Sequence, residues 1–399
     1  MHLVVLHHGL WGNISHVESV IPHLKEQHPD LLFLNIDTNQ GNLTYDGMDV
    51  CGDRVVQDIH KFMETNPVEK ISFIGYSLGG LILRYAVGRL YNEGFFKIVT
   101  PMNFVTLASP NLGTSRKQSV LNSIFNSIQT NVLVRVGYQF NLQDNYIDGK
   151  PLLVIMSDPE YDFYKGLALF KRRSCFANIL GDRSVRYCTA SITSTNPYNR
   201  FEPRIIDPEY PQIVCPDETK PKQPVPWTVS DIAPTALKLV AVPVLLSIWL
   251  PVATIGLGFN ATRAKVRQNS LAIENSWVRA SREDIDDISK ENLDQSSKEN
   301  LQATHIEEIN DSDLEDPNKL LSTEAPAIQV EESIDEVDLK QKTVRELMIH
   351  NLNQLEWEKV DIYNDKAFNA HAAIVLRKPF NSDEYRYPLV YLANKVFHH

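Results

Sequence analysis

The sequence predicts an α/β fold in which a mostly parallel sheet is flanked by helices. Up to about residue 182, short apolar runs alternate with segments whose apolar residues recur at helical spacing, as they do in βαβ units. At residues 71–80, a strand-like run leads through a glycine-flanked serine into a helix-like run. We therefore expect right-handed crossovers and a functional site at the carboxyl ends of the strands.

The serine of this junction lies in the sequence Gly75-Tyr76-Ser77-Leu78-Gly79. This pattern is typical of a nucleophile elbow, in which residues without bulk on both sides of the serine let a strand and a helix pass closely. The Ser77 hydroxyl would project above the sheet edge, and the Leu78 amide would point at an oxyanion beside it. The junction thus predicts the α/β-hydrolase fold with Ser77 as nucleophile. The alternative is a glycine-rich turn with an idle serine.

The individual elements follow from the same patterns. Strands are expected at 3–7, 31–36, 70–74, 103–107 and 176–180, and helices near 16–27, 48–64 and 78–91. Residues 111–174 interrupt the alternation with mixed helix and loop, where a hydrolase would carry a cap or lid. Near the C-terminus, residues 344–355 have helical spacing and residues 357–363 look like a strand.

Composition divides the remaining chain. Residues 282–340 are dense in Asp, Glu, Ser, Asn and Gln and lack Gly, Trp, Tyr and Phe, so they cannot bury enough apolar surface to offset their ordering entropy. The expected organisation is a hydrolase core at 1–230 with a lid-like insertion at 111–174, an apolar membrane or lipid-surface segment at 231–262, an acidic disordered insertion at 263–340, and the rest of the core at 341–399.

Residues 239–259 of the apolar segment carry no charged side chain. As a helix they would be just long enough to span the hydrocarbon core of a membrane. Pro243 and Pro251 each remove a helical hydrogen bond, so a bent or hairpin insertion into one leaflet is an equal expectation. The flanking cations Lys238 and Arg263 suit anionic cytosolic head groups. A buried core segment, or a lid helix over an acyl pocket, is the alternative.

Charge and cysteine usage limit the possible partners and compartments. The 399-residue chain has a formal net charge of −11, which argues against nucleic acid, since neutralising phosphates requires a basic surface. The four cysteines show neither C-x-x-C nor zinc-ligand spacing, so reduced thiols are expected. The apolar run at 3–6 is too short for a signal peptide. We expect a protein that faces the cytosol and is not secreted.

A serine nucleophile needs an imidazole to take its proton and an acid to fix the imidazole tautomer, in the chain order serine, acid, histidine. Asp182 follows an apolar strand-like run and is the predicted acid; a plain turn aspartate is the alternative. Rival acids are Asp158, Asp162 and Asp207, none of which follows so clear a strand.

The predicted base is His371, which lies in a small-residue loop after the last predicted strand. The other histidines downstream of the acid are poorer candidates because of their surroundings. His305 lies in the acidic tract, His350 lies within a helical pattern, and His398 and His399 end the sequence.

The second oxyanion donor is expected after the first strand. Gly9 and Gly12 let the backbone approach the substrate there, and the Leu10 amide is the candidate donor beside Leu78. A metal site at His7 and His8 is not expected, because adjacent histidines leaving a strand point to opposite faces and have no evident carboxylate partner. The proposed chemistry needs no metal and no organic cofactor.

Four motifs in order resemble those of the DUF676 family of serine esterases. They lie at 8–12 (HGLWG), at 42–47 with 51–54 (NLTYDG, CGDR), at 75–80 (GYSLGG) and at 107–113 (LASPNLG). The chain is most similar to the ROG1-type fungal lipases, in the branch that includes the yeast lipid-droplet phospholipase. The resemblance covers residues 1–190 well and 341–399 loosely. It implies hydrolysis of acyl esters in glycerophospholipids and makes attachment to lipid droplets plausible.

Two positions depart from the family pattern. Tyr76 replaces the commoner histidine of the elbow, and Asn111 replaces the histidine usual after Ser-Pro. Neither position has a proton-transfer role in the triad, so we expect activity to survive while substrate preference is less certain.

These observations predict a lipase or phospholipase that acts at a membrane or lipid-droplet surface on a phospholipid or other acyl lipid. An acyl-thioesterase or acyltransferase would use the same triad with a different acceptor and pocket. A membrane-associated scaffold without catalysis is the alternative from another class, and its expected sign would be a damaged triad. The sequence indicates no particular protein partner.

Overall fold

The computed structural model describes residues 1–114, 135–222, 334–377 and 383–399. The described residues up to 222 and those from 341 onward belong to one compact unit. The apolar segment at 239–259 and nearly all of the predicted acidic insertion lie outside the described residues. Within the described part of the chain, no helix combines the length and the apolar character needed to cross a membrane.

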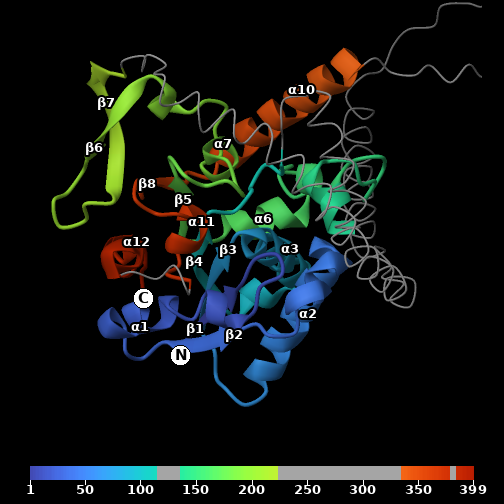
Figure 1. Ribbon diagram of the computed structural model, residues 1–399. Helices are drawn as coiled ribbons and strands as arrows, with labels where there is room; N and C mark the ends of the chain where they lie inside the picture. The colour runs from blue at the N-terminus through green and yellow to red at the C-terminus, as the bar shows by residue number, and fades with distance from the viewer. Residues whose placement is uncertain (115–134, 223–333, 378–382) are drawn as a thin grey trace, which may run out of the picture. The chain divides into compact units, whose positions relative to one another are not determined.

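Eight strands in the described residues form one sheet, in the order β2-β1-β3-β4-β5-β8-β7-β6 (Figure 1). Their bounds are β1 His2–His7, β2 Leu32–Asn35, β3 Lys70–Tyr76, β4 Thr100–Leu107, β5 Arg172–Asn178, β6 Phe201–Ile205, β7 Ile213–Pro221 and β8 Glu358–Ile362. The six strands from β2 to β8 in this order run parallel, and β7 and β6 continue the sheet antiparallel. This mostly parallel sheet is that of the predicted α/β-hydrolase fold, and β3, the strand that precedes the elbow, lies between β1 and β4.

Helices cover both faces of this sheet (Figure 1). The α-helices are α1 Val20–Gln27, α2 Met48–Met63, α3 Leu78–Asn92, α5 Leu152–Ile155, α6 Asp162–Ala168, α7 Tyr187–Ala190, α10 Ile334–Asn353, α11 Ala370–Ala373 and α12 Tyr387–Tyr391. Shorter 3-10 or π turns are η1 Ile14–His16, η2 Gly41–Asp46, η3 Phe95–Lys97, η4 Pro197–Asn199, η5 Asp383–Tyr385 and η6 Leu392–Val396.

One face of the sheet packs against α1 and α12, where Val4 and Leu6 of β1 share an apolar cluster with Leu24 and Leu389. On the other face, α3 lies between α2 and α6 (Figure 1). Successive side chains of a strand point to opposite faces, so the four central residues of β1, 3–6, are apolar on both sides to serve both layers, and all six residues of the strand are buried.

The predicted strands and helices are present with shifted bounds. The strand expected at 176–180 begins earlier, because β5 already pairs with β4 at Arg172. The helix expected near 16–27 divides into the turn η1 and α1. Part of the segment expected to be lid-like, α6, packs on α3, where Phe163 fills the space beside Gly88. A lid role for the rest of 111–174 stays a prediction, and residues 115–134 are outside the described residues.

The described range 334–377 contributes one strand, β8, to the interior of the sheet. Strand β8 pairs parallel with β5 and antiparallel with β7. It leads to α11, which lies beside the C-terminal ends of β3 and β5 (Figure 1). A segment remote in sequence is thereby brought to the same sheet edge as the elbow.

Candidate active site

Ser77 lies in a strained turn between β3 and α3. Its φ of 54° is in a region that residues with a side chain rarely adopt. The turn is possible because its neighbours lack side chains: a Cβ on Gly75 would lie 2.4 Å from the Gly80 backbone, and one on Gly79 would lie 2.3 Å from the His7 carbonyl oxygen. The glycines predicted for the elbow are therefore required by close backbone approach.

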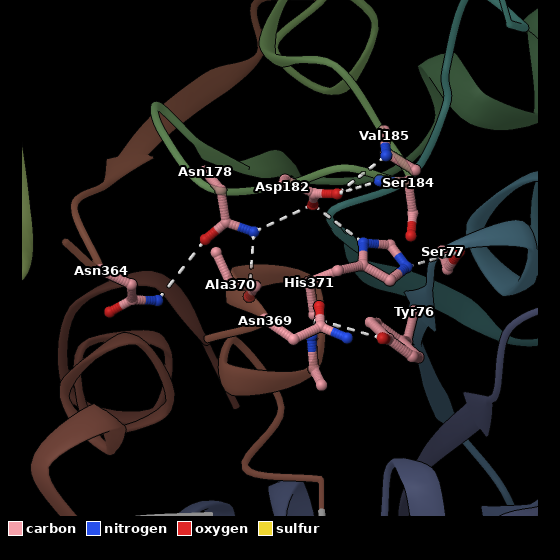
Figure 2. Close-up of polar contacts among 11 residues, drawn as sticks. Tyr76, Ser77, Asn178, Asp182, Ser184, Val185, Asn364, Asn369, Ala370 and His371 are labelled. Atoms are coloured by element: carbon pink, nitrogen blue, oxygen red, sulfur yellow. Dashed lines mark hydrogen bonds and ion pairs between the residues drawn. The ribbon is translucent and has the colours of Figure 1, made fainter. Parts of the chain in front are cut away.

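The three predicted triad residues lie within hydrogen-bond distance of one another (Figure 2). His371 Nε2 is 3.0 Å from Ser77 Oγ, and His371 Nδ1 is 2.8 Å from Asp182 Oδ2. With the proton on Nδ1, the imidazole donates to the carboxylate and leaves Nε2 to accept from the serine hydroxyl. The geometry is that required for moving a proton away from Ser77.

These residues come from three separate parts of the fold. Ser77 follows β3, Asp182 lies in the loop after β5, and His371 is the second residue of α11. His371 was expected in a loop; it lies instead in a short helix that Asn369 caps by accepting from the Ala372 amide at 3.2 Å. The rival acids have other partners, since Asp158 pairs with Lys150, Asp162 accepts from Asn92, and Asp207 accepts from the Glu209 amide.

Asp182 is buried and well supplied with donors. Its Oδ1 accepts from the amides of Ser184 at 2.9 Å and Val185 at 2.8 Å, and its Oδ2 accepts from Asn178 at 3.1 Å as well as from His371 (Figure 2). Burial alone would raise the pKa of Asp182, but the His371 charge and these hydrogen bonds outweigh it and hold the pKa below its usual value. Asp182 therefore accepts from the amides of its own turn, as a turn aspartate would, and it also contacts His371 as the predicted acid should.

Sequence reasoning missed Asn178, the last residue of β5. Its Nδ2 donates to Asp182 Oδ2 at 3.1 Å and to the Ala370 carbonyl at 3.2 Å. One side chain thus joins the loop of the acid to the helix of the histidine. The only sequence signal for it was a polar residue within an otherwise apolar predicted strand.

The two predicted oxyanion donors are positioned by the elbow and by the loop after β1. Leu78 is the first residue of α3, so its amide has no acceptor within the helix. Leu10 follows Gly9, where a Cβ would lie 2.7 Å from Ser77 Cβ. Neither amide donates to any acceptor among the residues that the structure describes. Leu78 directly follows Ser77, and Leu10 follows the glycine that contacts Ser77, so both N–H groups remain candidate oxyanion donors.

His7 and His8 do not point to opposite faces as expected: their ring centroids lie 4.9 Å apart, because His8 already lies beyond the end of β1. Both nitrogens of His7 are engaged, Nδ1 with the His8 carbonyl at 2.7 Å and Nε2 with Asn39 at 3.0 Å. Burial, with a smaller contribution from His8, lowers the pKa of His7 to about 3. In the described ranges no cluster of His, Cys, Asp and Glu could hold a metal ion.

Comparison with known proteins gives a family match for the N-terminal part of the chain. Residues 1–195 match the family described as "Putative serine esterase (DUF676)". The resemblance seen in the motifs is thereby confirmed for these residues. The match covers just under half of the chain and includes the strand, serine and helix of the elbow.

Two yeast proteins are among the sequence relatives. "Putative lipase ROG1" of Saccharomyces cerevisiae is 34% identical over 199 residues, which cover 48% of this chain and 28% of that protein. "Putative lipase C4A8.10" of Schizosaccharomyces pombe is 28% identical and is covered to 26% of its length. The chain therefore spans less than a third of either relative.

Solved structures are similar only at a distance. The product of gene lin2722 of Listeria innocua has a TM-score of 0.30 at 13% identity, covering 48% of this chain and 76% of that one. Phospholipase PlaB of Legionella pneumophila, in complex with thio-NAD, has a TM-score of 0.27 at 14% identity, covering 46% and 39%. Likeness of this degree carries no information on the substrate.

Proposed function

We propose that this chain is a serine hydrolase that cleaves acyl esters of glycerophospholipids. The observation that carries the proposal is the continuous hydrogen-bonded relay from Ser77 through His371 to Asp182, with two backbone amides as candidate oxyanion donors. Such a relay makes a hydroxyl nucleophilic without a metal.

In the proposed reaction, Ser77 Oγ attacks the acyl carbonyl carbon while its proton passes to His371 Nε2. The carbonyl oxygen becomes an oxyanion, which the Leu10 and Leu78 amides stabilise by donating to it. His371 then gives its proton to the departing alcohol oxygen, so the ester bond breaks and an acyl-serine forms. Water adds to the acyl-serine by the reverse sequence, returning the proton to Ser77 and releasing a fatty acid. Asp182 stays ionised and orients the imidazole.

The test is replacement of Ser77. Purified Ser77→Ala is expected to lose release of fatty acid from phospholipid and labelling by a fluorophosphonate, because both need the Oγ nucleophile. Ser157→Ala is the control, since Ser157 is a buried serine away from the site whose hydroxyl donates to a backbone carbonyl, that of Val154, at 2.7 Å. Turnover by Ser77→Ala equal to that of the wild type would exclude this mechanism.

Exposed apolar side chains on the site loops support a lipid substrate. Trp11, in the loop after β1, is 51% exposed, Leu180, in the loop after β5, is 53% exposed, and Phe368, in the loop before α11, is 77% exposed. Each is at most three residues from a residue assigned to the chemistry. The Arg183 guanidinium lies 5.9 Å from the Phe368 ring centroid and would suit an anionic head group. Such a rim would favour substrates that are presented at a lipid surface.

This part of the proposal predicts a difference between substrates. Phe368→Ser should lower the rate on phosphatidylserine-containing vesicles several-fold and leave the rate on a soluble short-chain ester unchanged, because only the vesicle meets the rim. Ile98→Ser is the control, since Ile98 is 78% exposed but precedes β4 at the opposite sheet edge. Equal losses on vesicles and soluble ester would contradict a surface role.

We further propose that the enzyme faces the cytosol and attaches to lipid droplets or an intracellular membrane through residues 239–259. The support is the uncharged sequence of this segment and its basic flanks. All four cysteines are free thiols, which suits a reducing compartment. Deletion of 239–259 should move the protein from the membrane to the soluble fraction; unchanged partition would favour a lid or core role for the segment.

A further inference from the structure

Tyr76, the last residue of β3 and the neighbour of Ser77, contacts the predicted base directly. Its hydroxyl donates to the backbone carbonyl of His371 at 2.9 Å, across 295 residues of sequence. Its ring centroid also lies 5.0 Å from that of the His371 imidazole, with 36° between the ring planes (Figure 2). The Tyr76 side chain is buried, and burial raises the pKa of its phenol, which therefore stays protonated as a donor.

The Tyr76 hydroxyl supplies a hydrogen-bond donor for the His371 carbonyl, which the described backbone near α11 does not provide. Helix α11 has four residues, and the amides that follow it donate to Ala370, Ala372 and Ala373. Within the described ranges, no backbone amide donates to the carbonyl of His371. The Tyr76 hydroxyl therefore gives this buried carbonyl its hydrogen bond and fixes it relative to β3.

We infer that Tyr76 is a positioning residue for catalysis, because it holds the backbone and the ring of His371 where Nε2 meets Ser77 Oγ. This inference rests on the proposed function. Tyr76 and Ser77 are adjacent in one strained turn. The same stretch of backbone therefore positions both the Ser77 nucleophile and the tyrosine that contacts His371. Tyr76 thus affects the rate of the chemical step, in addition to any effect on substrate preference.

The test is Tyr76→Phe, which keeps the ring and removes the hydroxyl. A misplacement of His371 of about 1 Å can cost up to about 100-fold in rate, so we expect kcat on a soluble ester to fall about 10- to 100-fold while KM changes less than about twofold. Labelling of Ser77 by a fluorophosphonate should slow by a similar factor, because it needs the same proton transfer.

The matched control is Tyr164→Phe. Tyr164 is also a buried tyrosine, and its hydroxyl donates to a backbone carbonyl, that of Asn351, at 3.1 Å, away from Ser77. Both variants should lower the unfolding temperature to a similar small extent, but Tyr164→Phe should keep the wild-type kcat. Rates are divided by the folded fraction, measured by circular dichroism, so that lost folding is not counted as lost catalysis.

Three outcomes separate the inference from the function on which it rests. Wild-type labelling at Ser77 with a specific loss of kcat in Tyr76→Phe supports a positioning role. Wild-type labelling with equal corrected kcat in Tyr76→Phe and Tyr164→Phe overturns that role and leaves the hydrolase intact. A wild type that neither labels nor hydrolyses any ester overturns the proposed function itself.

Discussion

The Asn178 side chain holds both the Asp182 carboxylate and the helix that carries His371. Its amide nitrogen donates both to Asp182 Oδ2 and to the Ala370 carbonyl, and its side chain is buried. A hydrogen bond to a buried charge contributes more than a neutral one, because removing it leaves the charge without compensation. Asn178 therefore stabilises the folded state and orients the acid at once.

Asn178→Ala should lower the free energy of unfolding by about 1.5–3 kcal/mol, because it removes a hydrogen bond to a charged group. It should also lower kcat, since Asp182 and α11 lose their common link. Urea unfolding and ester hydrolysis measure the two effects. Asn66→Ala is the control: Asn66 also donates to two acceptors, Phe62 and Thr65, but is remote from the site. A stability loss no larger than that of Asn66→Ala would contradict this account.

The lowered pKa of Asp182 predicts how stability depends on pH. Burial raises this pKa, but His371 and the surrounding donors lower it further, so the folded value lies below the unfolded one. An ionised Asp182 thus contributes stability above its unfolded pKa of about 4, and this contribution is lost as the pH falls through the folded pKa. Asp182→Asn should be less stable than the wild type at pH 7, and the difference should narrow as the pH falls from about 4 to 2.

Urea unfolding at several pH values checks this. A difference between wild type and Asp182→Asn that stays constant down to pH 2 would mean that the carboxylate is not stabilised by its neighbours.

The crossing of β3 and α3 is built from backbone contacts. Beyond Gly75, which meets Gly80, a Cβ on Gly80 would lie 2.3 Å from Ser109 Oγ. Strand and helix therefore meet backbone to backbone, and the Ser109 side chain of the loop after β4 packs directly against Gly80, so both elements hold the strained turn at Ser77 in place.

Gly75→Ala should lower the free energy of unfolding by about 3 kcal/mol or more, at the upper end of overpacking costs, because its Cβ would meet backbone atoms that cannot rotate away. Gly41→Ala is the control. Gly41 has φ +58° and nothing within 4 Å of a Cβ, so it should cost only about 1 kcal/mol for backbone conformation. Urea unfolding compares the two, and equal losses would show that close approach at the elbow is unimportant.

The elements that sequence predicted best are those buried on both sides. Strands β1, β3 and β4 are apolar runs, and their periodicity distinguishes them from the amphipathic helix α2. The antiparallel strands β6 and β7 were not predicted, because Pro203 and Pro216 interrupt their pattern and proline is unfavourable inside a sheet. The start of β5 was missed because Arg172 and Arg173 mask its apolar character.

The site was predictable where chemistry dictates residue type and chain order. Ser77, Asp182 and His371 were identified on that basis, and the structure brings them together. The supporting contacts of Tyr76 and Asn178 were not predicted, because they join residues far apart in sequence and their residue types suit many environments. Only the fold decides which distant carbonyl each will meet.

The continuity of the sheet depends on β8, which lies between β5 and β7. Without this strand, β5 would end as an open edge, and α11 with His371 would have no support. The segment 358–373 thus supplies a strand of the sheet as well as the predicted base, although more than a hundred residues separate it from β7.

Cutting the chain between β7 and β8 should therefore leave an associated pair of fragments. A specific protease site placed near residue 300, in the predicted acidic insertion, should allow cleavage after which both fragments co-elute and keep esterase activity, because β8 stays paired on both sides. A chain that ends at residue 340 is the control and should be inactive. Separation of the fragments on a sizing column, or loss of activity on cleavage, would contradict the central role of β8.

The distance between acid and base along the chain also sets an order in time. Asp182 and His371 are 189 residues apart, so a ribosome working at about 5–20 residues per second completes the acid's segment roughly 10–40 s before the histidine's. Throughout that interval the nascent chain holds its serine but no base to activate it. The apolar segment at 239–259 is translated within the same interval. The predicted base is therefore synthesised only after the segment that is proposed to attach the chain to a lipid surface.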